Sequence, residues 1–473
     1  MLCACSSEPT APPNIVFIFT DDQAPWALGA SGYAHAQTPH IDRLFHGGAY
    51  LVNAFTTTPV CSPSRASLMA SRYGTELGIT EWINPRREPD MGLDPAVVTW
   101  PEVLQQNGYR TGLVGKWHLG VPDQFHPSRT GFDYFMGFRT GGTTPSNPTL
   151  EKDGETREFE GLTADILTDH AIEFLEAASP DDKEKPFLLS LHFRAPHARW
   201  LPVADEDWAP FESLDPTLPH PDYPNLDTER IKRMTREYLA SVKSVDRNVG
   251  RILSALEEGG HREDTIIIFT SDHGYSMGHN GIWHKGNGHW VLTQAPPATE
   301  NIPEGQRPNM YDHSIRVPTA VYWPGTIQAG SRVTQTVSNL DWYPTILAMA
   351  GADLPEGELI RGRDFLPILQ GQSPDWDNDF YAQYSTHHQS HTHMRMYRTA
   401  EWKLIRDFLN EGRDELYNLA DDPGETTNLI ASEDAAVETV VSRLDGKILE
   451  AMRETNDPVI ELALARVHQI AAE

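Results

Sequence analysis

Cys61 begins the chemically most informative segment of this chain of 473 residues. The segment reads Cys-Ser-Pro-Ser-Arg, with Pro63 and Arg65 at its third and fifth positions. Because proline suits the first turn of a helix, we predict a short helix over residues 64–72 whose amino end points at Cys61. A helix start attracts anions, and Arg65 adds a positive charge beside the thiol. The segment therefore predicts an anion site beside the Cys61 thiol; the simpler alternative is a buried free cysteine in front of a helix.

Two acidic pairs predict a metal site. Asp21 and Asp22 are adjacent, and Asp272 is followed by His273. Neighbouring carboxylates repel each other, and their pKa values are raised unless a cation lies between them. Either pair alone could also serve capping or turn chemistry. Oxygen ligands favour Ca²⁺, whereas one imidazole leaves Mn²⁺ or another transition metal as an alternative.

The elements that must position these residues are buried strands alternating with helices. Residues 14–20 form a continuous apolar run that ends at Asp21, which is typical of a buried parallel strand. Similar runs at residues 110–115, 186–193 and 265–269 lead to Lys116 and His118, to His197, and to Asp272. Because ligands in open α/β sheets bind beyond the carboxyl ends of the strands, we expect these polar groups to meet in one crevice. Apolar residues at helical spacing within residues 228–256 predict a helix that covers one face of the sheet.

Length and charge limit the class of protein. The chain fits one large α/β domain with a smaller appended one, and we divide it into a tail (1–12), a catalytic domain (13–374) and a C-terminal subdomain (375–473). In the subdomain we predict strands over residues 380–384, 402–407 and 415–419 and a helix over 432–453. The net charge of −29 argues against nucleic acid as a partner, and no apolar run has transmembrane length.

The first residues contain the other two cysteines, Cys3 and Cys5, which are too close together to form a useful structural disulfide. The sequence Met-Leu-Cys-Ala-Cys is similar to the end of a bacterial lipoprotein signal in which Cys5 is acylated. The basic and apolar parts of such a signal are absent, and a tail without a role is the alternative. A lipid anchor at Cys5 would place the protein in the periplasm or on the cell surface.

The Cys-x-Pro-x-Arg segment resembles the signature of type I sulfatases, in which the cysteine is oxidised to formylglycine. Further matches, which extend the resemblance over most of the chain, are residues 115–120, 196–197, 283–286, 311–318, 341–345 and 415–419. The resemblance implies an alkaline-phosphatase-like α/β fold, a mixed sheet flanked by helices, with a smaller C-terminal α+β subdomain. It also implies a formylglycine-generating maturation enzyme as a partner. One departure concerns that partner, because Ala70-Ser71-Arg72 replaces the usual Thr-Gly-Arg.

The resemblance also implies a role for each site residue. The hydrated aldehyde of formylglycine has two hydroxyls on one carbon, so that one can attack sulfur and the other can collapse the sulfated hemiacetal after the alcohol has left. The implied metal ligands include the residue at position 61, and many relatives have Asn where His273 stands. The implied roles are metal binding by Asp21, Asp22, Cys61, Asp272 and His273, sulfate binding by Lys116 and Lys285, base catalysis by His118, contact with the leaving oxygen by His197, and a fixed positive charge from Arg65.

These matches predict a sulfatase acting on a sulfate ester, with a sulfated carbohydrate as substrate. Candidate sugar contacts, with ordinary surface packing as the alternative, are Trp82, Arg86, Arg87, Trp200, His289 and Trp290. The rival functions are a phosphonate monoester or phosphodiester hydrolase on the same scaffold and, if Cys61 is not matured, a sulfoglycan-binding protein without turnover. Four histidines at positions 387, 388, 391 and 393 are irregularly spaced, which favours a substrate rim or a solvated loop over a metal site.

Overall fold

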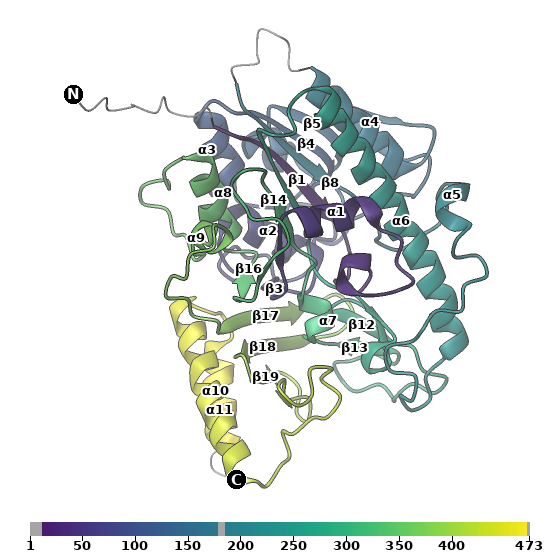
Figure 1. The fold of residues 1–473 in the computed structure, drawn as a ribbon. Helices are drawn as coiled ribbons and strands as arrows, with labels where there is room; N and C mark the ends of the chain where they lie inside the picture. Colours follow the sequence, from purple (N-terminus) through teal and green to yellow (C-terminus); the bar gives the residue numbers. More distant parts are fainter. Residues whose placement is uncertain (1–11, 178–184, 471–473) are drawn as a thin grey trace.

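A computed structural model of the chain describes residues 12–177 and 185–470, so the predicted anchor at Cys5 lies outside the described residues. Within them, a ten-stranded mixed sheet forms the centre of the larger domain (Figure 1). In spatial order its strands are β15 (Ser331–Val333), β2 (Ala49–Leu51), β14 (Ala320–Tyr322), β9 (Thr265–Ser271), β1 (Asn14–Thr20), β8 (Phe187–His192), β4 (Arg110–Lys116), β5 (Tyr134–Phe138), β6 (Thr149–Lys152) and β7 (Glu155–Glu158).

The middle of the sheet explains the apolar runs in the sequence. β1 lies between β8 and β9 and pairs with both in parallel. Val16 and Ile18 contribute to the core on one face of β1, and Ile15 and Phe17 contribute to the core on the other. A strand covered on both faces needs apolar side chains in both directions, so it reads as a continuous run. The four predicted strands that lead to polar clusters are β1, β4, β8 and β9, and the structure confirms them.

Helices cover both faces of this sheet. α1 (Pro39–Gly47), α4 (Thr163–Glu176) and the predicted long helix α6 (Thr228–Glu258) pack on one face. α2 (Cys61–Ala70), α3 (Trp100–Gln106) and α8 (Trp342–Ala350) pack on the other. Short helices complete the connections: α5 (Asp205–Trp208), α7 (Asp312–Ile315) and α9 (Leu366–Leu369).

α2 differs from its prediction at both ends. The helix begins at Cys61 itself, after the extended Val60, and Pro63 lies within its first turn. It ends before Ser71, which adopts the left-handed conformation with φ 52° that favours glycine. Two hydrogen bonds hold Ser71 there: its N–H donates to the carbonyl of Ser67, and its hydroxyl donates to the carbonyl of Leu340, both at 2.8 Å. The structure therefore accommodates serine at the position where the resemblance expects glycine.

The C-terminal part contains a four-stranded antiparallel sheet with two helices beside it (Figure 1). Three of these strands and α10 match the predictions, whereas β18 and α11 were missed. β18 lies in the histidine-rich region that the polar composition predicted as a loop, and buried apolar side chains at Met394 and Met396 hold it in the sheet. These elements are β17 (Phe380–Thr386), β18 (Thr392–Arg398), β19 (Trp402–Asp407), β20 (Glu415–Asn418), α10 (Ala435–Glu454) and α11 (Ile460–Ile470).

Two smaller sheets connect the two parts within the described chain. One, beside the active-site region, consists of β10 (Ser276–Met277), β11 (Ile282–His284), β12 (Asn287–Trp290) and β13 (Gln306–Pro308); the other pairs β16 (Val337–Ser338) with β3 (Ala54–Phe55). The predicted fold class, a mixed sheet flanked by helices with a smaller C-terminal α+β part, is confirmed. The exact boundary at residue 375 stays a prediction.

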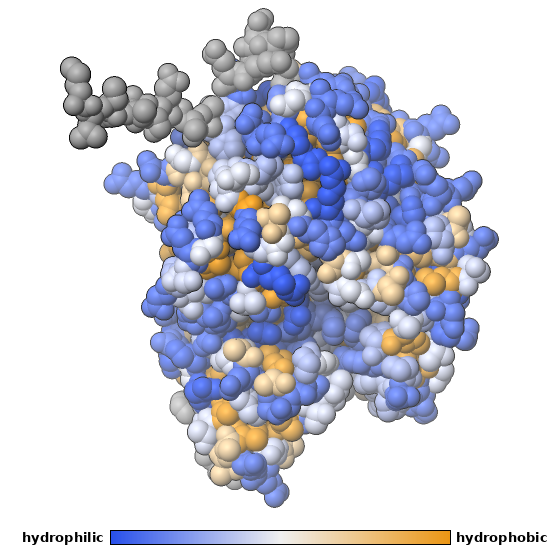
Figure 2. Space-filling view, in the orientation of Figure 1, coloured by the Kyte–Doolittle hydropathy of each residue, from blue (hydrophilic) through white to orange (hydrophobic). Residues whose placement is uncertain are grey.

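The face drawn in Figure 2 is mostly hydrophilic, and hydrophobic residues occur on it as small separate patches. Among the described helices, none combines the length and the apolar character that crossing a bilayer requires.

Candidate active site

The predicted polar groups converge where the central strands end. Asp21 and Asp22 follow β1, Lys116 ends β4, and Asp272 follows β9. Cys61 faces them from the first position of α2. Each of these side chains is buried, and Asp22 has the left-handed backbone conformation, with φ 69°. Strained backbone conformations in non-glycine residues concentrate at functional sites, so the conformation of Asp22 agrees with a functional site at this edge of the sheet.

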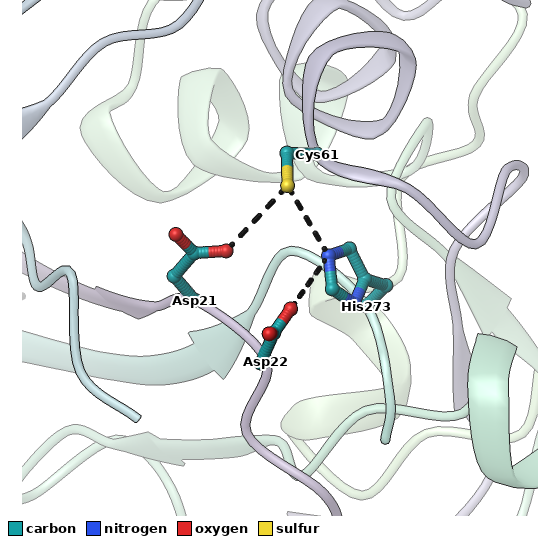
Figure 3. A group of neighbouring side chains, drawn as sticks. All are labelled: Asp21, Asp22, Cys61 and His273. Atoms are coloured by element: carbon teal, nitrogen blue, oxygen red, sulfur yellow. Dashed lines mark hydrogen bonds and ion pairs between the residues drawn. The ribbon is translucent and has the colours of Figure 1, made fainter. Parts of the chain in front are cut away.

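Four side chains lie in positions where one metal ion could bind them together (Figure 3). Ligand atoms of Asp21, Asp22, Cys61 and His273 all lie within 4.8 Å of one another. The Cys61 sulfur lies 3.6 Å from Asp21 Oδ1 and 3.6 Å from His273 Nε2. Nδ1 of His273 lies 2.9 Å from the carbonyl of Gly274, so it carries the proton and leaves the Nε2 lone pair directed into the cluster.

Asp272, the fifth predicted ligand, lies at the edge of this group. Its Oδ1 is 3.3 Å from His273 Nε2, and its Oδ2 accepts a hydrogen bond from Arg65 Nε at 3.0 Å. Burial and the charge of Asp21 raise the pKa of Asp272 to about 7. Arg65 therefore acts here mainly on a carboxylate, and its NH1 group also donates to the carbonyl of Lys116 at 2.9 Å.

Two buried lysines flank the sulfur. Lys116 Nζ lies 2.5 Å from Asp21 Oδ2, and Lys285 Nζ lies 2.7 Å from Asp22 Oδ1 and 3.0 Å from the Cys61 sulfur. Although burial raises the pKa of the Cys61 thiol, Lys116 and Lys285 lower it more, so that it falls well below its usual value. The site therefore favours a negatively charged group at position 61.

His118 is positioned through the same helix. Ser62 in α2 accepts a hydrogen bond from the N–H of Ile83 at 2.9 Å, and the carbonyl of Ile83 lies 3.0 Å from His118 Nε2. Nε2 therefore carries the proton, and Nδ1, which is buried and has no hydrogen-bond partner among the described residues, is the basic nitrogen. Burial and the charge of Lys116 lower the pKa of His118, while nearby Cys61 opposes this shift. The surroundings of His118 therefore favour its neutral imidazole.

His197 lies close enough to the acidic pair for their charges to act on it. Its Nδ1 lies 2.6 Å from the carbonyl of Ala198, so Nδ1 carries the proton and Nε2 carries the lone pair. Burial lowers the pKa of His197, and the charges of Asp22 and Asp21 oppose that shift. Burial would lower the pKa of Lys285, but Asp22 and Cys61 raise it well above its usual value, so Lys285 is a fixed cation.

A pocket of about 340 Å³ opens onto the sulfur. Its lining combines the predicted groups Cys61, His118, His197 and Lys285 with residues that the sequence did not single out. The pocket's added lining residues are Val60, Ile83, Pro85, Gly141, Gly142, His284 and Asn287. Gly141 lies against His118, since a Cβ at Gly141 would lie 2.7 Å from the His118 ring. The pair of adjacent glycines was the feature of the sequence that could have indicated this part of the pocket.

Of the aromatic residues predicted to contact a sugar, only Trp82 lines this pocket within the described residues. Trp200 is 6% exposed and packs against Tyr238 and Trp283, so it belongs to the core. The His289 ring packs at a tilt against Trp283 with ring centroids 5.5 Å apart, and Trp290 lies beside Arg307. Proximity in sequence to a motif did not determine where these side chains point, because packing of the small β10–β13 sheet takes them away from the pocket.

The two predicted arginine contacts are also absent from the pocket lining. Arg87 NH1 donates to the carbonyl of His388 at 2.9 Å, which holds the C-terminal part against this segment. Arg86 lies in an exposed turn, where its N–H donates to Asn84 Oδ1. The neighbour that does line the pocket is Pro85.

Comparisons with known proteins agree with this geometry. The sulfatase family profile matches residues 13–352, and the profile of the C-terminal region of N-sulphoglucosamine sulphohydrolase matches residues 306–454. The chain is 27% identical to an N-acetylglucosamine-6-O-sulfatase of Bacteroides thetaiotaomicron, over 97% of this chain and 90% of that protein. It is 31% identical to arylsulfatase G of Mus musculus, over 78% and 71% of the two chains. A solved structure of BT4656 in complex with its substrate D-glucosamine-2-N,6-O-disulfate superposes with a TM-score of 0.80 at 25% identity, covering 94% of this chain and 99% of that one.

Proposed function

The chain belongs to the sulfatase family and is a sulfuric ester hydrolase; we propose that its substrate is a sulfated carbohydrate and its nucleophile a formylglycine made from Cys61. The observation that carries the proposal is the position of Cys61, at the base of a pocket between two buried lysines and three carboxylates. The Cys61 sulfur stands where a formylglycine oxygen would lie. The test is turnover of sulfated monosaccharides by matured protein, with a phosphodiester and a phosphonate monoester assayed in parallel.

The residues around position 61 fit a divalent cation. Asp22 Oδ2 is buried without a hydrogen-bond partner among the described residues, and Asp21 and Asp22 hold Lys116 and Lys285 by short ion pairs. If the lysines turn to a sulfate group, the carboxylates need another positive charge, because isolated buried carboxylates are costly. Asp21, Asp22, Asp272, His273 and residue 61 would hold the metal, with Ca²⁺ favoured by the oxygen-rich set and Mn²⁺ as the alternative. When bound, the metal supplies positive charge that favours ionisation of the nucleophile and withdraws charge from the sulfate.

Each of the polar side chains around residue 61 would then have its own role in the reaction. Formylglycine, when present and hydrated, supplies one hydroxyl that attacks sulfur and a second that allows the aldehyde to be regenerated. Lys116 and Lys285 bind the sulfate oxygens, and their fixed charges stabilise the negative charge that develops there. His118 removes the proton of the second hydroxyl through Nδ1. His197 protonates the leaving alkoxide, because the charge of a bound sulfate raises the pKa of a nearby imidazole.

The low pKa of His118 gives a testable pH dependence. A base must be unprotonated, so a lowered pKa extends activity toward acid, and the rate falls only when pH drops through the folded-state pKa. We expect the acid limb of kcat to lie below 6.5, the usual value for histidine, because burial and Lys116 disfavour the imidazolium. The measurement is the pH profile of kcat for the native enzyme and for His118→Ala. An acid limb at or above the usual histidine value, or one unchanged in the variant, would contradict the assignment.

Gly141 and Gly142 offer a matched pair for testing the position of His118. An added Cβ at Gly141 would lie 2.7 Å from His118 Cε1 and Nε2, whereas one at Gly142 would meet nothing within 4 Å. Neither glycine has a positive φ in the range that alanine avoids. We expect Gly141→Ala to lower kcat about tenfold to a hundredfold by displacing the base, and Gly142→Ala to retain it, since small misplacements of catalytic groups cost up to about 10²-fold. Equal kcat values for the two variants would contradict the proposed position of His118 beside the reacting group.

The substrate class rests on the relatives and on the pocket. The bacterial relative is named for a sulfate on N-acetylglucosamine, and the superposed structure holds a disulfated glucosamine. The side of the pocket formed by Trp82, Ile83 and Pro85 is apolar, and an aromatic face is suited to packing against a sugar ring. We extend the proposal to a periplasmic or cell-surface location with an anchor at Cys5, and to a formylglycine-generating enzyme as the maturation partner.

A further inference from the structure

Two histidines of the C-terminal sheet meet two glutamates of the segment that follows α2, outside the active site. Among the described residues, ligand atoms of Glu81, His387 and His388 all lie within 4.8 Å of one another. Glu88 adds a second carboxylate: its Oε1 lies 2.8 Å from His387 Nε2, and its Oε2 lies 3.2 Å from His388 Nε2. Four groups of the types that bind transition metals therefore gather between residues about 300 positions apart in the chain.

The backbone holds this cluster in place. The Glu81 side chain is only 3% exposed, and its Oε2 accepts hydrogen bonds from the N–H groups of His387 at 2.6 Å and His388 at 2.9 Å. Arg87 fixes the same turn by donating to the carbonyl of His388. Adjacent residues on a strand point to opposite faces, but β17 ends at Thr386, and the turn after it brings both imidazoles together with ring centroids 4.4 Å apart.

Charge balance indicates what the cluster would bind. A metal binds imidazole in its neutral form, so the charge that a bound divalent cation would balance is that of the two glutamate carboxylates. Two imidazole nitrogens with two carboxylate oxygens suit zinc and similar transition metals better than Ca²⁺, which prefers oxygen alone. We propose that Glu81, Glu88, His387 and His388 bind a divalent transition metal of the zinc class, at a site separate from the sulfatase metal.

The site would act on the wall of the substrate pocket. Trp82, which follows Glu81, lines that pocket. Its ring packs against the His388 ring with centroids 4.6 Å apart, and its carbonyl accepts a hydrogen bond from His388 Nε2 at 3.0 Å, so His388 would offer Nδ1 to a metal. A metal ion in the cluster thus ties the turn after β17 to the segment that carries Trp82, and it stabilises the junction between the two parts of the fold.

Zinc stoichiometry tests this site without relying on activity. Chelator-treated protein is first given excess Ca²⁺ to fill the oxygen-rich active site and is then titrated with Zn²⁺ by calorimetry, with bound metal counted by mass spectrometry. The native chain is expected to bind one zinc more than His387→Gln and one more than Glu88→Gln. Because second-shell changes alone cost about 10–100-fold in metal affinity, loss of a ligand should weaken this zinc by at least about 100-fold.

The matched control is His391→Gln, which changes an exposed histidine of the same connection. It should keep the additional zinc and the accompanying rise in melting temperature. Equal zinc content in the native chain and His387→Gln, zinc lost equally in His391→Gln, or no zinc bound by the native chain would each overturn the proposal. Zinc that enters the active-site cluster would be present in all three variants and therefore cancels in the comparison.

Discussion

Cys61→Ala is expected to lower turnover of a sulfate ester by at least about 10⁴-fold, because removal of a covalent nucleophile leaves only the binding and electrostatic contributions of the site. The residue is 2% exposed, and the fixed cation Lys285 lies 3.0 Å from its sulfur. The measurement is kcat on a sulfated monosaccharide for matured native protein and for the variant.

Melting temperature is the control for this substitution, since alanine removes one buried atom and should leave the fold intact. A folded Cys61→Ala protein that retains more than a hundredth of the native rate would contradict a nucleophilic role for residue 61. Loss of turnover together with retained binding of the sulfated sugar would agree with it.

Lys285→Ala is expected to lower kcat/KM by about 10²–10³-fold, the usual cost of removing one preorganised group that stabilises transition-state charge. Lys285 lies between Asp22 and residue 61 and is held as a cation, so its loss removes positive charge at the place where sulfate would bind. Steady-state kinetics with a sulfated monosaccharide measures the effect.

The matched control is Lys232→Ala, which removes a lysine from a surface pair with Asp215 and should change kcat/KM little. Truncating one partner of a buried pair can also destabilise a protein by about 3–5 kcal/mol, so the melting temperature of Lys285→Ala is measured and the assay is run well below it. A folded variant within a factor of five of the native enzyme would contradict sulfate binding by Lys285.

The convergence of the polar side chains could be predicted from the sequence, because they follow apolar runs that the topology of the sheet brings together. Asp21, Lys116 and Asp272 each stand where an apolar run ends, and parallel strands bring such ends to one edge. Cys61 could be identified as a candidate site residue from the proline and arginine that follow it in the sequence. The fold class and the sulfatase family could also be predicted from the sequence, because the matching motifs are spread along most of the chain.

The pocket wall was less predictable because it depends on packing between distant segments. Trp200 and His289 lie near motif residues in sequence, yet they pack against Tyr238 and Trp283 rather than in the pocket. The turn that brings His387 and His388 together also depends on tertiary contacts, above all with Glu81, which no local periodicity shows.

The most direct test of the central claim is the mass of the peptide that contains residue 61, after the chain is produced together with a formylglycine-generating enzyme. We expect a loss of about 18 Da relative to cysteine, because a thiol becomes an aldehyde. We also expect sulfatase activity across preparations to rise in proportion to this modified fraction. Active protein whose residue 61 is entirely unmodified cysteine would contradict the claim. Unmodified and inactive protein, despite a competent maturation enzyme, would contradict the assignment of Cys61 as its substrate and would point first to Ala70-Ser71.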